Sequence, residues 1–114
     1  MSYDRFIYFK KGKVPPRADV GKVLEDYLGA LLTRNRWKKD RWMAQLMGSK
    51  SWPFRRVEPA AQCPWSPHSE DRWIEVYVDT NNIDVITRGQ DELVNNVARG
   101  FAELVARYWR GQLG

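Results

Sequence analysis

Residues 73–87 hold the feature that most restricts the fold of this chain, because two alternating runs meet there at a polar turn. In the first run, Ile74, Val76 and Val78 alternate with Glu75, Tyr77 and Asp79. This period of two is typical of a strand with one buried face. Strand chemistry resumes at Ile83–Thr87 after Asn81-Asn82, which suits a two-residue hairpin loop because Asn tolerates positive φ. The sequence therefore predicts an antiparallel hairpin.

The register of this hairpin can be argued from its loop. With Asn81-Asn82 as the loop, the expected partners are Val78 with Val85, Tyr77 with Ile86, Glu75 with Arg88, and Asp79 with Asp84. The Glu75–Arg88 pair is favourable, whereas Asp79–Asp84 is unfavourable unless both carboxylates are solvated or share a cation. A one-residue slip would place Asp84 in the apolar face, so we expect this register.

A long helix is expected after the hairpin. Thr87 and Gln90 have the spacing of a capping box, and Asp91 and Glu92 place negative charge at the expected N-terminus. Apolar residues then recur at steps of three and four. Arg107 and Arg110 lie in the last turn and Gly111 follows, as the helix dipole and C-cap rules require. These signals predict a helix over Gln90–Arg110.

The N-terminal half predicts a strand and a helix. Arg5–Lys10 is apolar on both faces, which is typical of a central strand. A suitable N-cap and an apolar stripe predict a helix over Asp19–Thr33, in which Gly21 and Gly29 permit close packing against the sheet. Asn35–Gly48 is ambiguous between a short helix and a strand with Trp42, Ala44 and Leu46 on one face. We expect a helix there.

Residues 49–71 form the irregular part of the sequence, with four prolines. We expect an ordered loop, with Trp52–Val57 as an edge strand because proline is tolerated at sheet edges. The chain of 114 residues is then one domain, over residues 1–114. The predicted fold is α+β, a two-layer sandwich of about three to five antiparallel strands with both helices on one face. The expected core is Phe6, Tyr8, Leu24, Leu28, Leu31, Val76, Val78, Val85, Val94, Val97, Phe101, Leu104 and Val105.

Composition indicates the setting in which the protein acts. The formal net charge of +5 favours anionic partners. The single cysteine, Cys63, allows no disulfide within the chain, which fits a reducing cytoplasm. No apolar run reaches eighteen residues, and Met1–Arg5 lacks the apolar segment of a secretory signal. We therefore expect a cytoplasmic protein with no membrane partner.

The sequence offers little chemistry for catalysis. No nucleophile elbow, phosphate-binding loop or dinucleotide fingerprint is present. Cys63 and His68 are two soft ligands where structural zinc needs four, so we expect neither a metal nor another cofactor. Glu75, Asp79 and Asp84 would hold Mg²⁺ for phosphoryl chemistry if they converged, but we favour a solvated hairpin face. The sequence predicts no catalytic residues and favours a non-enzymatic protein.

Protein interaction is the favoured class of function. The chain has six tryptophans, and Trp and Arg are enriched at interface hot spots. The residues expected to bind a partner are Trp52, Arg55, Arg56, Trp65 and Trp109. An exposed hairpin edge would also allow a second copy to extend the sheet. The sequence therefore favours a small binding protein that self-associates or is a subunit of a complex.

Binding of single-stranded nucleic acid is the alternative. Cations contact phosphates while aromatic rings stack on bases, which is how single strands are commonly held. The residues that fit this pattern are Arg34, Arg36, Trp37, Lys38, Lys39 and Arg41. This alternative predicts binding that weakens steeply with salt.

Overall fold

The computed structural model describes residues 2–47, 72–88 and 92–114. The elements in chain order are β1 (Ser2–Tyr8), α1 (Arg17–Leu28), the 3-10 turn η1 (Gly29–Leu31), β2 (Leu32–Lys38), β3 (Arg41–Leu46), β4 (Trp73–Val78), β5 (Asn82–Arg88), α2 (Glu92–Tyr108) and β6 (Gln112–Leu113). The predicted α+β class is confirmed. The described sheet, however, has six strands rather than three to five. The predicted edge strand Trp52–Val57 lies outside the described residues.

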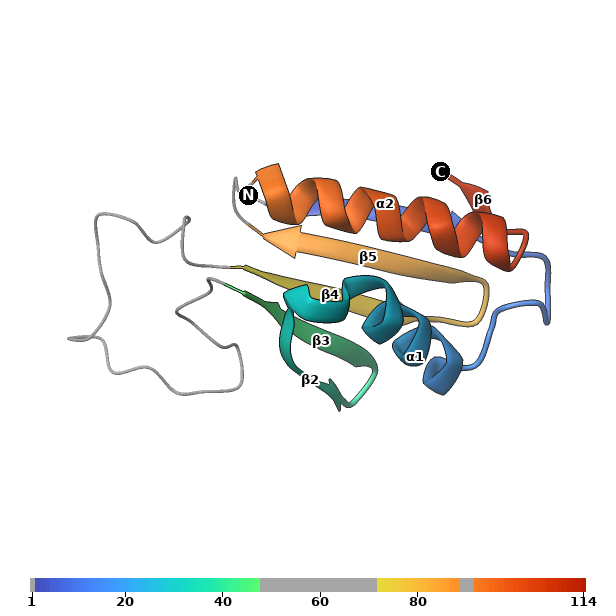
Figure 1. The fold of residues 1–114 in the computed structure, drawn as a ribbon. Coiled ribbons are helices and arrows are strands. Elements are labelled where there is room, and N and C mark those ends of the chain that lie inside the picture. The colour runs from blue at the N-terminus through green and yellow to red at the C-terminus, as the bar shows by residue number, and fades with distance from the viewer. Residues whose placement is uncertain (1, 48–71, 89–91) are drawn as a thin grey trace.

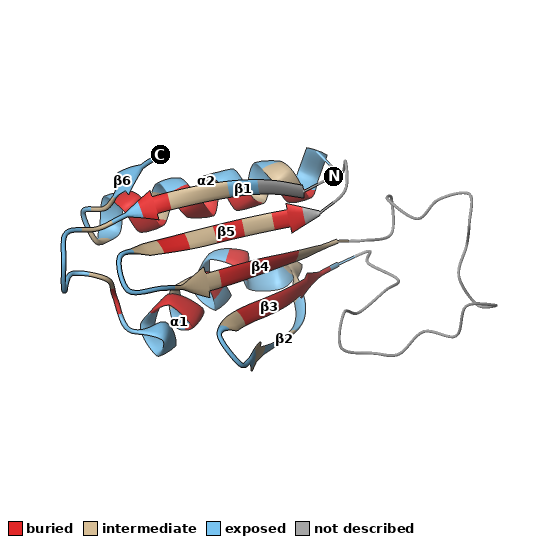
Figure 2. Cartoon of the chain, turned by 180° about the vertical axis from the view of Figure 1, so that it is seen from behind, coloured by how far each residue is buried: buried red, intermediate tan, exposed pale blue. Residues whose placement is uncertain are grey.

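The strands form one antiparallel sheet in the order β2-β3-β4-β5-β1-β6. Figure 1 shows α1 and α2 in front of this sheet, and Figure 2, seen from behind, shows the strands in front of both helices. The β4–β5 hairpin lies at the centre, with β3 on one side and β1 on the other. The expectation that its edge is free to pair with a second copy is therefore wrong.

The central hairpin is shifted by two residues from the predicted register. Tyr77 pairs with Asp84 and Glu75 with Ile86, and the loop is Thr80-Asn81 rather than Asn81-Asn82. The predicted pairs Asp79–Asp84 and Glu75–Arg88 are therefore wrong. Neither loop residue has positive φ, so the turn does not use the property of Asn that suggested the loop. Because the period of a strand is two, this shift leaves every side chain on its predicted face.

Residues 32–46 form a second hairpin, where the sequence predicted a short helix over Asn35–Gly48. Trp42, Ala44 and Leu46 share one face of β3 and are buried, as the strand alternative required. The hairpin closes at Lys39-Asp40, with Lys39 at φ 54°. The helix prediction is wrong because these residues bury their apolar side chains at alternate positions against the helices.

Helix α1 begins and ends earlier than the predicted Asp19–Thr33. Its N-cap is Pro16, which places Asp19 in the first turn. The helix ends where Gly29 adopts φ 51°, a conformation that glycine accepts most readily. The prediction that Gly21 permits close packing is confirmed, because a Cβ at this position would lie 3.1 Å from Nε1 of the buried Trp42. The same prediction is wrong for Gly29, where a Cβ would meet no described atom within 4 Å.

Helix α2 is described over Glu92–Tyr108 and ends before the predicted Arg110, while the predicted start at Gln90 lies outside the described residues. Thr87 is not its N-cap, because this residue belongs to β5 and is fully buried. Its hydroxyl donates to Oδ1 of Asn95, so the predicted capping box is wrong. At the other end, the N–H of Gly111 donates to the carbonyl of Ala106 over 2.8 Å. This bond closes the helix, but the left-handed residue is Arg110 at φ 56° rather than Gly111, so the predicted glycine C-cap is wrong.

The core lies between the two helices and the sheet face that they cover, as the buried residues in Figure 2 show. Its buried members are Ile7, Val20, Leu24, Leu28, Trp42, Ala44, Leu46, Ile74, Val76, Ile83, Val85, Val94, Ala98, Phe101, Ala102, Val105 and Ala106. Leu31, Val78 and Val97 pack against them, and Leu104 is half-buried. The placement of Phe6 and Tyr8 in the core is wrong. Both lie on the opposite face, and Ile7 between them is the buried residue.

Candidate functional site

The sheet surface opposite the helices is the candidate site, and we name it the open face. No helix among the described residues covers it (Figure 2). The strand register places two rows of side chains across this face. The Glu75 row is Arg36, Met43, Glu75, Ile86 and Asp4. The Tyr77 row is Lys38, Arg41, Tyr77, Asp84 and Phe6.

Aromatic side chains are prominent on the open face. The rings of Phe6 and Tyr8 on β1 stack with their centroids 6.0 Å apart. Tyr8 is 49% exposed, whereas Phe6 and Tyr77 are half-buried. Trp73 lies on the same face of β4, and its Nε1 is buried without a hydrogen-bond partner in the described part of the chain. The face therefore combines apolar rings with polar groups that are incompletely paired.

Charge is divided across the open face. The cations Arg34, Arg36, Lys38 and Arg41 come from β2 and β3, while the carboxylates Glu75, Asp84 and Asp4 come from β4, β5 and β1. Nη1 of Arg41 donates to Oε1 of Glu75 over 3.1 Å and to the hydroxyl oxygen of Tyr77 over 2.6 Å. Arg41 thus connects the basic side of the face to the acidic side.

Asp84 is the electrostatically unusual group of this face. Its Oδ1 is buried and accepts no hydrogen bond from any described residue. Burial, reinforced by the nearby negative charges of Asp4 and Glu75, raises the pKa of Asp84 from 3.8 to about 6. Both causes disfavour the ionised form of Asp84.

The residues expected to bind nucleic acid are divided between the two faces of the sheet. Arg34, Arg36, Lys38 and Arg41 share the open face, while Lys39 lies in the turn. Trp37 points to the helix side, where the guanidinium of Arg17 lies 4.4 Å from its ring centroid. Trp42 lies there too and is 2% exposed. The rings that accompany the cations are instead Phe6, Tyr8, Trp73 and Tyr77.

Of the residues expected to bind a protein partner, Trp52, Arg55, Arg56 and Trp65 lie outside the described residues. Trp109 is described and packs against the core at the end of α2. It lines a cleft of about 380 Å³ between α1 and α2, together with Asp19, Lys22, Val23, Asp26 and Tyr108. Tyr108 is 66% exposed and meets Trp109 edge to face at 4.9 Å. The structure therefore separates Trp109 from the open face.

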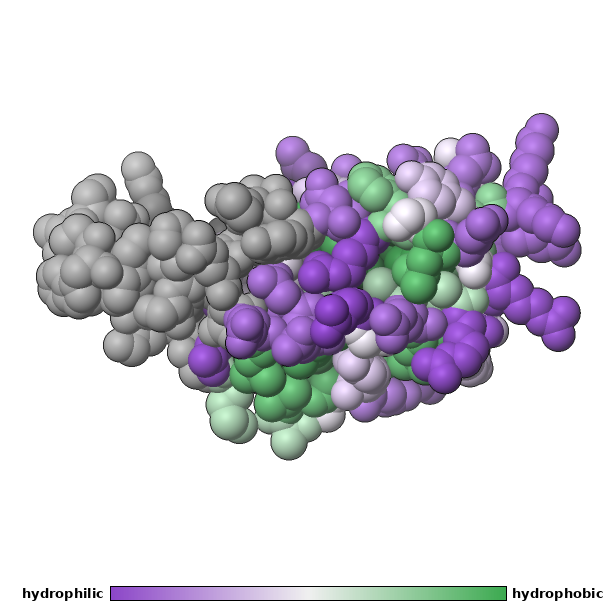
Figure 3. Space-filling view, turned by 90° about the horizontal axis from the view of Figure 1, so that it is seen from above, coloured by the Kyte–Doolittle hydropathy of each residue, from purple (hydrophilic) through white to green (hydrophobic). Residues whose placement is uncertain are grey.

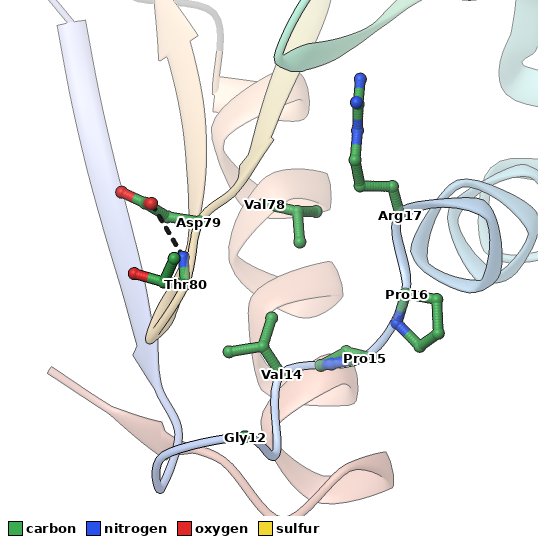
Figure 4. Close-up of a pocket in the computed structure, with 8 residues that line it drawn as sticks. All are labelled: Gly12, Val14, Pro15, Pro16, Arg17, Val78, Asp79 and Thr80. Atoms are coloured by element: carbon green, nitrogen blue, oxygen red, sulfur yellow. Dashed lines mark hydrogen bonds between the residues drawn. The ribbon is translucent and has the colours of Figure 1, made fainter.

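A second hollow of about 420 Å³ lies where the segment after β1 meets the end of β4. Figure 4 shows Val14, Pro15 and Val78 around it. The carboxylate of Asp79 accepts a bond from the N–H of Thr80, and its side chain points away from that of Arg17. No acid, base and nucleophile converge among these lining residues, so this hollow carries no catalytic arrangement.

The carboxylates that raised the possibility of a Mg²⁺ site are not brought together. Asp79 lies opposite Asn82, whereas Asp84 lies opposite Tyr77. Among the residues that the structure describes, no three His, Cys, Asp or Glu side chains could hold a metal ion. Cys63 and His68 fall outside these residues.

The outer side of α2 contrasts with the open face. Its exposed polar residues are Glu92, Asn96, Arg99, Glu103 and Arg107, and Leu93 and Tyr108 are exposed as well. Figure 3, seen from above, shows hydrophilic side chains along the length of the molecule and hydrophobic ones in separate patches. None of the described helices is long and apolar enough to cross a membrane.

Sequence reasoning missed the aromatic and acidic parts of the open face. The alternation of Asp4, Phe6 and Tyr8 with Arg5 and Ile7 was the available signal, but either set could face a core. No protein-family model matches this chain, and no curated protein and no solved structure matches it either. The geometry of the described residues therefore carries the functional argument alone.

Proposed function

We propose that this is a non-enzymatic interaction protein that uses the open face to bind protein, either a second copy of the chain or another subunit of a complex. The observation that carries this proposal is a sheet face that no described helix covers, with four aromatic side chains and divided charge. Met43, Gln45 and Glu75 in the middle of this face are buried, so its accessible part is the surrounding rings and charges. Aromatic residues and Arg are enriched at interface hot spots. The presence of one cysteine, Cys63, in the sequence supports action in a reducing compartment such as the cytoplasm.

The alternative explanation is a solvated face of the kind common in antiparallel sheets. Such a face carries polar side chains that water satisfies. Here Asp84 has a buried oxygen without a hydrogen bond, and Phe6 and Ile86 are apolar. These features favour a face that a partner covers.

Sedimentation velocity over a range of protein concentrations tests the proposal. The variant Phe6→Ser removes an aromatic ring from the open face and is expected to reduce self-association. Tyr108→Ser is the matched control, because Tyr108 is an exposed aromatic residue beside the α1–α2 cleft. Loss of association in Tyr108→Ser alone would assign the interface to the cleft that contains Trp109. A wild-type protein that stays monomeric at all concentrations would count against self-association.

Single-stranded nucleic acid is a second candidate, because the four cations and four aromatic rings share one face. Bases would stack on the rings while phosphates contact β2 and β3. Fluorescence anisotropy with a mixed-sequence oligonucleotide at two salt concentrations tests this. Arg36→Glu should weaken binding, and binding should fall steeply with salt. Binding that is absent at low salt, or that Arg36→Glu leaves unchanged, would remove this candidate.

A further inference from the structure

In the two rows of the open face, the cations lie on one side of β4 and the carboxylates Asp84 and Asp4 on the other, so the basic side of one copy can face the acidic side of a second copy. Each row begins at β2 with a cation, Arg36 in one row and Lys38 in the other, and crosses β4 at its middle. The carboxylates Asp84 and Asp4 lie beyond β4, on β5 and β1. Among the five strands of six or seven residues, β4 is the central one. A rotation about β4 therefore exchanges the basic side with the acidic side.

We propose that a second copy of this chain covers the open face, related to the first by a two-fold axis parallel to the strands and centred on β4. This inference rests on the proposed function and specifies its partner. Rotation by 180° about such an axis exchanges the two sides of the sheet and leaves each residue at its level along the strands. It therefore places β2 over β1 of the second copy, and β3 over β5 of the second copy.

This arrangement matches opposite charges on the two sides of the axis, whereas Glu75 and Tyr77, which lie on β4 at the axis, come opposite their own counterparts. Arg36 comes opposite Asp4 of the second copy in the Glu75 row, and Arg41 comes opposite Asp84 of the second copy in the Tyr77 row. Lys38 comes opposite the ring of Phe6 of the second copy, which suits a cation–π contact. Each contact occurs twice, because a two-fold interface uses the same patch on both copies.

Arg41 and Asp84 suit this contact. Both described hydrogen bonds of Arg41 leave from Nη1, and its side chain is 31% exposed. A guanidinium has five N–H donors, so others remain to face an acceptor. Asp84 lies between two carboxylates and has an oxygen without a donor. A cation from the second copy would compensate this group.

Charge also excludes the other face-to-face two-fold arrangement. An axis in the plane of the sheet but perpendicular to the strands would place β2 over β2 and β1 over β1. Arg36 would then face Arg36, and Asp4 would face Asp4. Like charges across an interface oppose association, so the axis along β4 is the favoured one.

The size of the open face fits a weak, reversible dimer. Five strands about 4.8 Å apart, each about six residues long, give a flat footprint of about 500 Å² per copy. Both copies together would bury at most about 1,000 Å², because Met43, Gln45 and Glu75 within this footprint are already buried in the monomer. This upper bound lies near the lower limit for specific interfaces. We therefore expect self-association that depends on concentration and weakens with salt.

Two charge reversals and their mixture test the arrangement. Arg36→Glu and Asp4→Lys change exposed residues, and circular dichroism checks that each variant keeps its fold. Each variant alone sets like charges against each other at both contacts and is expected to dimerise at least about tenfold more weakly than wild type. In an equimolar mixture, the heterodimer sets the introduced glutamate against the introduced lysine at one contact and keeps Arg36 against Asp4 at the other. The mixture should therefore regain most of the wild-type affinity, and native mass spectrometry identifies the heterodimer.

The outcomes separate this inference from the proposed function. Dimerisation of wild type without recovery in the mixture overturns the arrangement and leaves self-association in place. Pairing of Arg36→Glu with wild type that is tighter than the pairing of wild type with itself would assign the perpendicular axis, because only that axis sets the introduced glutamate against Arg36. A monomeric wild type overturns this arrangement together with self-association, whereas loss of an interaction with another subunit in Phe6→Ser would still support the proposed function. Stronger oligonucleotide binding by Asp4→Lys, without any dimer of wild type, would promote nucleic acid as the occupant.

Discussion

The two faces of the sheet differ in the side chains that they carry. On the helix side, Ile74, Val76 and Val85 belong to one continuous core with both helices. On the open face, the intervening residues Glu75 and Tyr77 lie among rings, cations and carboxylates. The comparison teaches that one face of each strand is enough to specify the fold, because packing against the helices fixes the alternation. The other face is then free to carry recognition chemistry.

The largest difference between the faces is expected from a pair of phenylalanines. Phe101 is fully buried under the helices, so Phe101→Ala should lower the free energy of unfolding by about 4 kcal/mol. Phe6 is half-buried on the open face, and Phe6→Ala should cost about 1 kcal/mol at a concentration where the protein is monomeric. Urea denaturation measures both. Equal costs would contradict the distinction between a core face and a recognition face.

A smaller effect is expected at the ion pair of the open face. Arg41→Met leaves the carboxylate of Glu75, which is 2% exposed, without its described cation. Breaking a buried ion pair from one side costs about 3–5 kcal/mol, and the partial exposure of Arg41 reduces this to about 2 kcal/mol. Adding Glu75→Gln removes the buried charge and should recover part of the loss. A double variant less stable than Arg41→Met would show that Glu75 is held by other groups.

Substitution of Asp84 should stabilise the monomer, whereas Arg41→Met should destabilise it. The pKa of Asp84 is about 6 in the folded chain and 3.8 as the ordinary value, so the folded state retains a proton that the unfolded state has lost between these pH values. The free energy of unfolding of the monomer should therefore fall as pH rises from about 4 to about 6, and stay lower above that. Asp84→Asn should stabilise the monomer at pH 7 by about 1.5 kcal/mol, after discounting for solvent screening. The exposed Asp79→Asn is the matched control, and an unchanged pH profile in Asp84→Asn would refute this assignment.

The smallest effect tests a polar group on the helix side. Thr87 is fully buried in β5, and its hydroxyl donates to Oδ1 of Asn95 on α2. Thr87→Val keeps the shape but removes the donor, so thermal denaturation should show a loss of about 1 kcal/mol. Removing the polar group would then destabilise the protein at Thr87 and stabilise it at Asp84. The reason is that the Thr87 hydroxyl has a hydrogen-bond partner among the described residues, whereas Oδ1 of Asp84 has none. A stabilised Thr87→Val would show that this bond contributes nothing.

The sequence predicts most clearly those elements whose periodicity has one interpretation. Alternation around Val76 and the stripe that contains Phe101 give the correct faces of β4 and α2. The hairpin register cannot be read in the same way, because a shift by two residues leaves the alternation unchanged. Only the observed loop, Thr80-Asn81, distinguishes the two registers.

The open face could not be predicted because its residues come from strands whose sequence alternation has more than one interpretation. Phe6 and Ile7 are both apolar, so the alternation of β1 does not show which one faces the core. The charges around Trp37 resemble the polar side of a helix, and the burial of Trp42, Ala44 and Leu46 becomes evident only when β3 is placed beside β4. The aromatic and acidic residues of the candidate site meet through pairing across the sheet rather than through proximity in sequence.

The pairing of β1 with β5 has a consequence for how the chain acquires its structure during synthesis. Ile7 pairs with Ile83, which follows it by 76 residues. At about 5–20 residues per second, a ribosome takes about 4–15 s to add that length, so the first strand waits several seconds for its neighbour. Such distant pairing also slows folding, because the loop must close before the contact forms. We therefore expect β1 to be the last long strand to join the sheet, after the β4–β5 hairpin has formed.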